Sequence, residues 1–283
     1  MLLTLLGSIC SFVPLLDGGS LAGWQESAAP QAAETAAYVE VSFPSIDDLA
    51  ITADLYRRAE GAEGKREEPF ILLCHQAGWS RGEYREIAPK LNRLGFDCLA
   101  IDQRSGGGIN EVRNETAARA KAADKPAAYV DAEQDILAAL AFVRENYADG
   151  PVILWGSSYS SALSLRVAGE HPELVDGVLA FAPGEYFTSS GKPKDWIARS
   201  ARKIAVPAFI TSAKHELPSW EELFEAIPDK RKASFLPESA GNHGSRALWE
   251  QFEDSPAYWK ATTDFLGAFL PEPAADEQPE RKG

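Results

Sequence analysis

The stretch that decides the interpretation of this sequence is Val152-Ile153-Leu154-Trp155-Gly156-Ser157-Ser158-Tyr159-Ser160-Ser161-Ala162. Its first four residues are apolar and predict a short buried strand, and a helical pattern begins at Tyr159, so little chain remains for the turn between them. A serine on such a cramped turn is presented as a nucleophile when the residues two before and two after it are small. Gly156 and Ser160 meet this condition for Ser158. The pattern therefore predicts that Ser158 is a nucleophile; the alternative is an ordinary junction with a helix-capping serine.

The chain around this stretch alternates between short apolar runs and amphipathic segments. Such alternation predicts an α/β fold with a mostly parallel sheet that is covered by helices on both faces. Ligands of such folds bind beyond the carboxyl ends of the strands. The expected strands are 38–43, 49–57, 70–74, 96–101, 152–155, 175–181, 206–211 and 233–236, and the expected helices are 83–94, 130–147, 159–168, 219–227 and 256–269.

A serine nucleophile needs a base and a carboxylate that orients the base. In this topology the carboxylate and then the histidine follow the serine along the chain. His243 lies between glycines in a loop after the last expected strand, so we expect it to be the base. Glu216 follows the strand 206–211 and is the expected acid. Glu185, which follows the preceding strand, is the alternative acid.

The same chemistry requires two N–H groups that stabilise an oxyanion. One is expected from Tyr159, directly after the nucleophile, and the other from the loop after the strand 70–74. That loop reads His75-Gln76-Ala77-Gly78. We expect Ala77 to be the second donor, with Gln76 as the alternative.

Residues 38–270 together resemble the α/β-hydrolase superfamily, in particular its dienelactone-hydrolase-like and small serine esterase members. The resemblance implies eight strands with the second antiparallel, a small cap, a Ser158–His243–Glu216 triad and an acyl-enzyme mechanism without metal or cofactor. The sequence departs from the usual pattern at Ser160 and Ala213, where glycine is common, and at Glu216, where aspartate is common. The segments that carry the resemblance are His75-Gln76-Ala77-Gly78, Asp102-Gln103-Arg104-Ser105-Gly106, Gly156-Ser157-Ser158-Tyr159-Ser160, the Glu216 loop and Asn242-His243-Gly244.

The expected activity is hydrolysis of a small or medium ester, as by a carboxylesterase. Two alternatives stay open, a peptide or amide hydrolase that uses the same site and a non-catalytic binding protein with the hydrolase fold. The segments 102–128 and 185–203 are the long connections at the carboxyl end of the expected sheet. Residues near this end that are expected to contact substrate are Trp79, Arg104, Glu185 and Tyr186.

The charge of the chain limits its partners. It carries 28 Lys and Arg against 42 Asp and Glu, a net charge of −14, without a basic stripe that would attract nucleic acid. No apolar run reaches the roughly 18 residues of a membrane-spanning helix. Cys74 and Cys98 lie in apolar runs without metal-ligand spacing. The expected partner is therefore a small-molecule substrate, and the sequence makes no prediction about the oligomeric state.

Both ends of the chain differ from the expected hydrolase domain. Residues 1–37 contain an apolar run followed by an Ala-rich linker, and the first basic residue is Arg57. A signal peptide normally begins with basic residues, so two interpretations remain: an export signal, which implies an exported protein, or a disordered tail on a cytoplasmic protein. Residues 271–283 are rich in Pro and Glu, and we expect a disordered tail.

Overall fold

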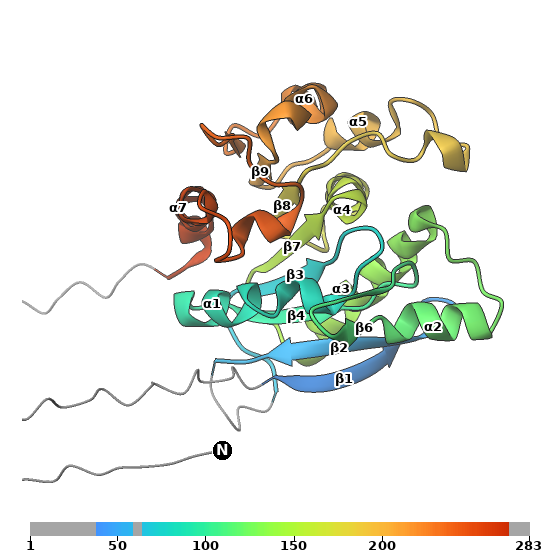
Figure 1. Cartoon of the computed structure of the whole chain (residues 1–283). Coiled ribbons are helices and arrows are strands. Elements are labelled where there is room, and N and C mark those ends of the chain that lie inside the picture. Colours follow the sequence, from blue (N-terminus) through green and yellow to red (C-terminus); the bar gives the residue numbers. More distant parts are fainter. Residues whose placement is uncertain (1–37, 59–63, 272–283) are drawn as a thin grey trace, which may run out of the picture. The chain divides into compact units, whose positions relative to one another are not determined.

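The computed structural model describes residues 38–58 and 64–271, and its main feature is one sheet of eight strands (Figure 1). The strands lie in the order β1-β2-β4-β3-β7-β8-β9-β10. Strand β2 is antiparallel to both of its neighbours, and all other pairs are parallel. The expected α/β class and the antiparallel second strand are thus confirmed. The strands are β1 Val39–Pro44, β2 Ala50–Tyr56, β3 Phe70–Cys74, β4 Asp97–Ile101, β7 Val152–Ser157, β8 Gly177–Phe181, β9 Ala208–Thr211 and β10 Ala233–Phe235.

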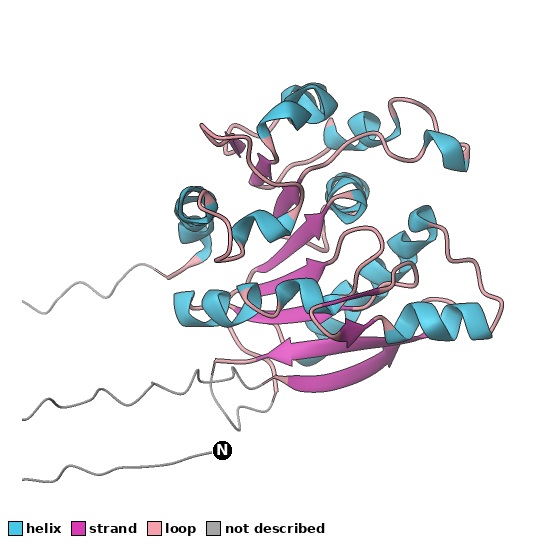
Figure 2. Cartoon of the chain, in the orientation of Figure 1, coloured by secondary structure: helices cyan, strands magenta, loops and turns pink. Residues whose placement is uncertain are grey.

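Helices cover both faces of the sheet (Figure 2). Helices α1 (Ile87–Leu94) and α7 (Ser255–Leu266) pack on one face. Helices that pack on the other face are α3 (Glu133–Asn146), α4 (Tyr159–Glu170), α5 (Trp196–Ala201) and α6 (Leu217–Ala226). Strand β3 shows the two-sided burial directly, because Leu72 and Cys74 belong to one core cluster and Ile71 and Leu73 to the other. This arrangement explains why the strands are apolar throughout rather than alternating.

The segment between β4 and α3, which the sequence predicts to be a long connection, contains regular structure. A hairpin of β5 (Gly108–Ile109) and β6 (Val112–Arg113) is followed by helix α2 (Glu115–Ala122). The hairpin turns at two residues with positive φ, and the Asn114 side chain caps α2 by accepting a hydrogen bond from the Ala117 N–H at 2.7 Å. The strands of this hairpin are too short for a periodic pattern to reveal them.

Short 3₁₀ turns account for most of the remaining differences from the expected helices. The expected helix 83–94 divides into a 3₁₀ turn, η1, and α1, and the expected helix 130–147 begins as a 3₁₀ turn, η2. The 3₁₀ turns are η1 Arg81–Tyr84, η2 Tyr129–Ala132, η3 Thr188–Ser190, η4 Lys214–Glu216, η5 Ser245–Leu248 and η6 Gly267–Phe269.

The interpretations of residues 1–37 as a signal or tail, and of the chain from residue 272 onward as a tail, lie outside the described residues. Within residues 38–58 and 64–271, no helix combines the length and the hydropathy that a membrane crossing requires.

The turn between β7 and α4 depends on the missing side chain of Gly156. A Cβ atom at this position would lie 2.4 Å from the Ser160 carbonyl oxygen, which is backbone and cannot rotate away. We expect Gly156→Ala to lower the free energy of unfolding by about 1–3 kcal/mol, measured by urea denaturation. Gly267→Ala is the control, because a Cβ atom there meets nothing within 4 Å. Equal stabilities of the two variants would contradict this account of the turn.

Candidate functional site

Ser158 lies between β7 and α4, at the carboxyl end of the central strands. Its backbone has φ 57° and ψ −122°, a conformation that costs a residue with a side chain about 1–3 kcal/mol. The strain is held in place from two sides: the Ser158 N–H donates to the Phe181 carbonyl at 2.7 Å, and its carbonyl accepts from the first turn of α4. A strained serine at the start of a helix matches the geometry expected of an activated nucleophile.

The ring of His243 lies between Ser158 and Glu216. Its Nε2 is 2.8 Å from Ser158 Oγ, and its Nδ1 contacts Glu216 Oε1. A carboxylate only accepts hydrogen bonds, so Nδ1 carries the proton and Nε2 accepts from the serine hydroxyl. Although burial raises it, the hydrogen bond and charge of His243 hold the pKa of Glu216 below its ordinary value. The structure thus brings the three residues together in the expected order.

Ser160 occupies the place where glycine is common, and the structure accommodates its side chain. The residue is fully buried, and its Oγ lies within hydrogen-bonding distance of the His75 carbonyl and, at 3.0 Å, of Gln103 Oε1. The contact with the His75 carbonyl joins the turn that carries Ser158, here called the nucleophile turn, to the loop after β3. The departure from glycine therefore adds a link between two loops.

The loop after β3 faces the start of α4, as expected for an oxyanion site. Among the described residues, no hydrogen bond is donated by the N–H of Tyr159 or Ala77. The Gln76 N–H, in contrast, donates to Glu83 Oε2 at 2.8 Å. This contact corrects the expectation that Gln76 is an alternative donor, because its N–H is already occupied. His75 holds the loop through its ring, and burial lowers its pKa to about 4, so the ring is neutral.

Glu83 is a buried carboxylate near the site that belongs to none of the sequence motifs. It has no exposed surface, and its Oε1 accepts from the Ser157 hydroxyl at 2.7 Å. Burial raises the pKa of its carboxyl group to about 7, although hydrogen bonds from Ser157 and Gln76 oppose the rise. In the sequence, Glu83 looked like the polar start of a helix. No local sequence signal marks it, because its contact with the loop after β3, the hydrogen bond from the Gln76 N–H, forms only in the folded chain.

Arg104 does not face the site, contrary to expectation. Its side chain is fully buried, and its Nη2 donates to Asp47 and to Asp135 at 2.8 Å each. Its other nitrogens donate to the same two carboxylates and to the Pro126 carbonyl. This corrects the prediction that Arg104 contacts substrate, because its donors are already used in a buried ion-pair network.

Glu185 also has a structural task. Its two carboxylate oxygens accept from the N–H groups of Ile197 and Ala198, at 3.0 and 2.8 Å, and thereby cap helix α5. These contacts correct the alternative that Glu185 is the acid of the site, since Glu216 contacts His243. Tyr186 is 40% exposed, and its hydroxyl donates to the Ala182 carbonyl at 2.7 Å. Trp79 is half-buried and stacks on Trp249 at 5.3 Å.

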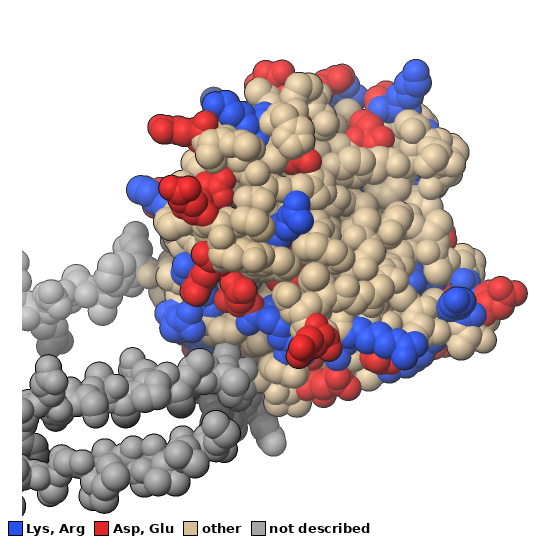
Figure 3. All heavy atoms as spheres, in the orientation of Figure 1, with Lys and Arg blue, Asp and Glu red and all other residues tan. Residues whose placement is uncertain are grey.

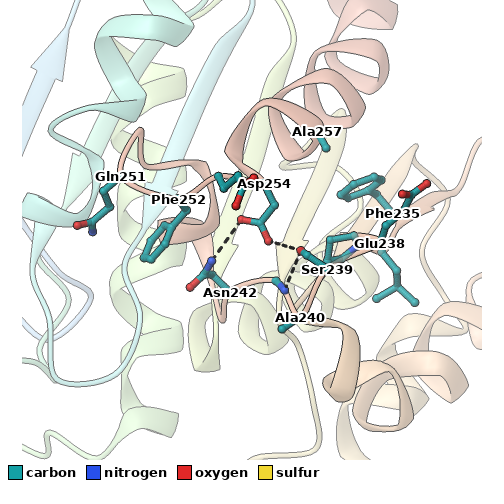
Figure 4. A pocket seen from close by; sticks show the side chains of 13 residues that line it. Phe235, Glu238, Ser239, Ala240, Asn242, Gln251, Phe252, Asp254 and Ala257 are labelled. Carbon is teal, nitrogen blue, oxygen red and sulfur yellow. Dashed lines mark hydrogen bonds between the residues drawn. The ribbon is translucent and has the colours of Figure 1, made fainter.

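A hollow of about 740 Å³ lies beside the loop that carries His243, here called the histidine loop, and is lined in part by Gly241 and Asn242 (Figure 4). It extends from β10 to the start of α7, and Asp254 braces it by accepting from Ser239 Oγ at 2.7 Å and from Asn242 Nδ2 at 3.4 Å. Because Asn242 directly precedes His243, these contacts support the loop that carries the base. Figure 3 shows that a broad part of the molecular face in this view, right of its centre, carries no charged side chain.

Comparison with known proteins agrees with the observed fold. Residues 69–199 match the family described as the alpha/beta hydrolase fold. A dienelactone hydrolase from Anabaena variabilis ATCC 29413 is similar in structure, with 17% identity, 84% of this chain and 100% of that chain covered, and a TM-score of 0.60.

An esterase of Pyrococcus furiosus is also similar, with 16% identity, 83% and 93% covered, and a TM-score of 0.61. A soluble variant of a monoglyceride lipase from Saccharomyces cerevisiae has 13% identity, 86% and 99% covered, and a TM-score of 0.58. Comparison with curated proteins finds no match. Identities this low establish the fold alone.

The buried network around Arg104 can be tested by stability. We expect Arg104→Met to lower the free energy of unfolding by about 3–5 kcal/mol, because Asp135 would remain as a buried unpaired charge. Arg113→Met, an exposed arginine of the same connection, is the control. Denaturant melts and steady-state kinetics would both be measured. An Arg104→Met variant of normal stability with a raised KM would restore the substrate-contact interpretation.

Proposed function

Since this chain has the α/β-hydrolase fold, we propose that it is a serine hydrolase that cleaves a small or medium carboxylic ester. The single observation that carries the proposal is the His243 ring, which contacts both Ser158 Oγ and the Glu216 carboxylate. A buried, strained serine that is hydrogen-bonded to an oriented histidine has no simple role in stabilising the fold. The esterase and the lipase among the structurally similar proteins support an ester as the substrate class.

In the proposed reaction, His243 Nε2 removes the Ser158 proton as Oγ attacks the ester carbonyl carbon. Glu216 keeps the proton on Nδ1 and stabilises the imidazolium that forms. The oxyanion is held by the N–H groups of Tyr159 and Ala77, each of which stabilises the transition state by about 3 kcal/mol. The imidazolium then protonates the leaving alcohol, and water, activated by the same histidine, cleaves the acyl-enzyme.

The expected size of the substrate follows from the residues around the site. The cap between β8 and β9 is short and consists of η3 and α5. Two tyrosines near the site keep exposed rings: Tyr129, which is 41% exposed and lies 4.6 Å from the Tyr159 ring, and Tyr186. A short cap and aromatic side chains suit an ester of modest size with an apolar part.

The nucleophile is tested by Ser158→Ala. We expect turnover of p-nitrophenyl acetate to fall by about 10⁴-fold or more, because the attacking oxygen is removed. Labelling by a fluorophosphonate probe should disappear as well. The melting temperature should change little, since the hydroxyl group is small and only its contact with His243 is lost. Ser219→Ala, at the exposed start of α6, is the control.

Each alternative function has its own outcome in this experiment. A parent chain that neither turns over the ester nor reacts with the probe would contradict the proposal and favour a non-catalytic binding protein. A parent chain that reacts with the probe but prefers anilides to esters would favour an amide hydrolase. Probe labelling that survives in Ser158→Ala would show that the nucleophile is another residue.

The acid is tested by comparing Glu216→Gln with Glu185→Gln. We expect Glu216→Gln to lower kcat by about 10³–10⁴-fold, because a neutral amide no longer stabilises the imidazolium and can hold the wrong tautomer of His243. Glu185→Gln should keep most of the activity and lower the melting temperature, because it weakens the cap of α5. The reverse pattern of kcat values would place the acid after β8.

A further inference from the structure

Glu83 lies at the point where three loops of the proposed site meet. Its Oε2 accepts from the Gln76 N–H, next to the proposed oxyanion donor Ala77. Its Oε1 accepts from the hydroxyl of Ser157, the residue before the proposed nucleophile. The Ser157 oxygen in turn accepts from the Ser245 N–H at 2.9 Å, two residues after the proposed base. One side chain thus connects the oxyanion loop, the nucleophile turn and the histidine loop.

The charge of Glu83 is not neutralised by a close cation. None of the ion pairs among the described residues includes its carboxylate. The two arginines nearest to it in sequence, Arg81 and Arg85, pair instead with Asp54 on β2, and Arg81 also pairs with Asp102 after β4.

The ionisable groups that act on Glu83 come from three places. His243 acts from the loop after β10, Arg246 from η5, and the Tyr84 phenol from the same turn as Glu83. Burial is the strongest influence, and it places the titration of the carboxyl group near neutral pH, at a pKa of about 7. The carboxyl group of Glu83 therefore changes its charge near neutral pH.

Protonation of Glu83 changes the hydrogen bonds between the loops. As a carboxylate, Glu83 accepts from both Gln76 and Ser157. When Glu83 is a neutral acid, one of its oxygens carries a hydrogen and becomes a donor. The hydrogen of Glu83 and the hydroxyl hydrogen of Ser157 then cannot both lie between the two side chains. Ser157 would have to turn its hydroxyl away from Glu83 and find another acceptor. A buried hydroxyl without an acceptor is costly, so the loops are expected to shift.

We infer that Glu83 is a positioning residue that, as a carboxylate, holds the nucleophile turn, the oxyanion loop and the histidine loop in register, and whose protonation lowers activity. The inference rests on the proposed hydrolase function of the same site. Protonation of Glu83 then contributes to the fall in rate at low pH, the acid limb of the pH–rate profile, in addition to protonation of the proposed base His243. Glu83 does not touch the reacting atoms.

The first test is Glu83→Gln, with Glu86→Gln as the control. Glutamine has the shape of the protonated acid and does not titrate, so we expect kcat/KM at pH 8 to fall by about 10- to 100-fold. The acid limb should move to lower pH, because the contribution of Glu83 is lost. Glu86 is exposed and three residues along the same segment, and Glu86→Gln should leave both rate and profile unchanged. Rates would be measured from pH 5 to 9 on the full chain.

The second test is Ser157→Ala, for which the inference predicts the opposite shift. The hydrogen bond from Ser157 lowers the pKa of Glu83, so its removal should raise that pKa and move the acid limb to higher pH. A purely structural role of Glu83 would lower the activity of both variants without moving the limb in opposite directions. If Glu83→Gln fails to fold, the shift in Ser157→Ala decides the question.

Fluorophosphonate labelling of Ser158 separates this inference from the proposed function. If the parent chain is not labelled, the proposed function and the inference both fail. If the parent is labelled and Glu83→Gln keeps the parent's rate and profile, only the inference fails. An acid limb that stays in place in Ser157→Ala likewise overturns the inference, while opposite shifts in the two variants support it.

Discussion

The close approach of Gly156 to the backbone of Ser160 is the constraint on which the site depends. A Cβ atom at Gly156 would come within 2.4 Å of that carbonyl, so only glycine lets β7 turn directly into α4. The turn forces Ser158 into its strained conformation and presents it at the carboxyl end of the central strands. The fold holds this strain through β8, whose Phe181 carbonyl accepts the Ser158 N–H. The position of the proposed nucleophile is thus a consequence of strand packing.

Buried acidic side chains organise the loops around this turn. Asp102, after β4, accepts from the N–H groups of Arg81 and Glu115 and so fixes both η1 and α2. Asp135 forms a buried ion pair with Arg104, which lies in the same connection between β4 and α3. Glu83 connects the nucleophile turn with the oxyanion and histidine loops. Each carboxylate satisfies several backbone or hydroxyl donors, which gives loops without regular hydrogen bonding a defined geometry.

Most of the fold could be predicted because each strand is a short apolar run between polar residues. The run 70–74 has the same limits in the sequence pattern and in the structure, since both faces of β3 are buried. The helix expected at 83–94 begins later, because Arg81–Tyr84 forms a 3₁₀ turn held by the buried Asp102. The hairpin leaves no periodic signal because its strands have two residues each, and α2 is a short helix in which only Thr116 and Ala120 are buried.

The sequence by itself determined where the strands follow one another along the chain and that Ser158 lies on a turn between a strand and a helix. It also determined that the candidates Glu216 and His243 come after the later strands. Only the tertiary structure decided which charged groups are available to act. Arg104 pairs with Asp47, which lies 57 positions before it, and with Asp135, which lies 31 positions after it. Glu83 accepts a hydrogen bond from Ser157, which lies 74 positions after it. Glu185 and Glu216 follow neighbouring strands in the same way, yet one caps a helix and the other contacts the base. The reason is physical: burial and partners set the charge and role of an ionisable side chain, and both arise from contacts between segments that are remote in sequence.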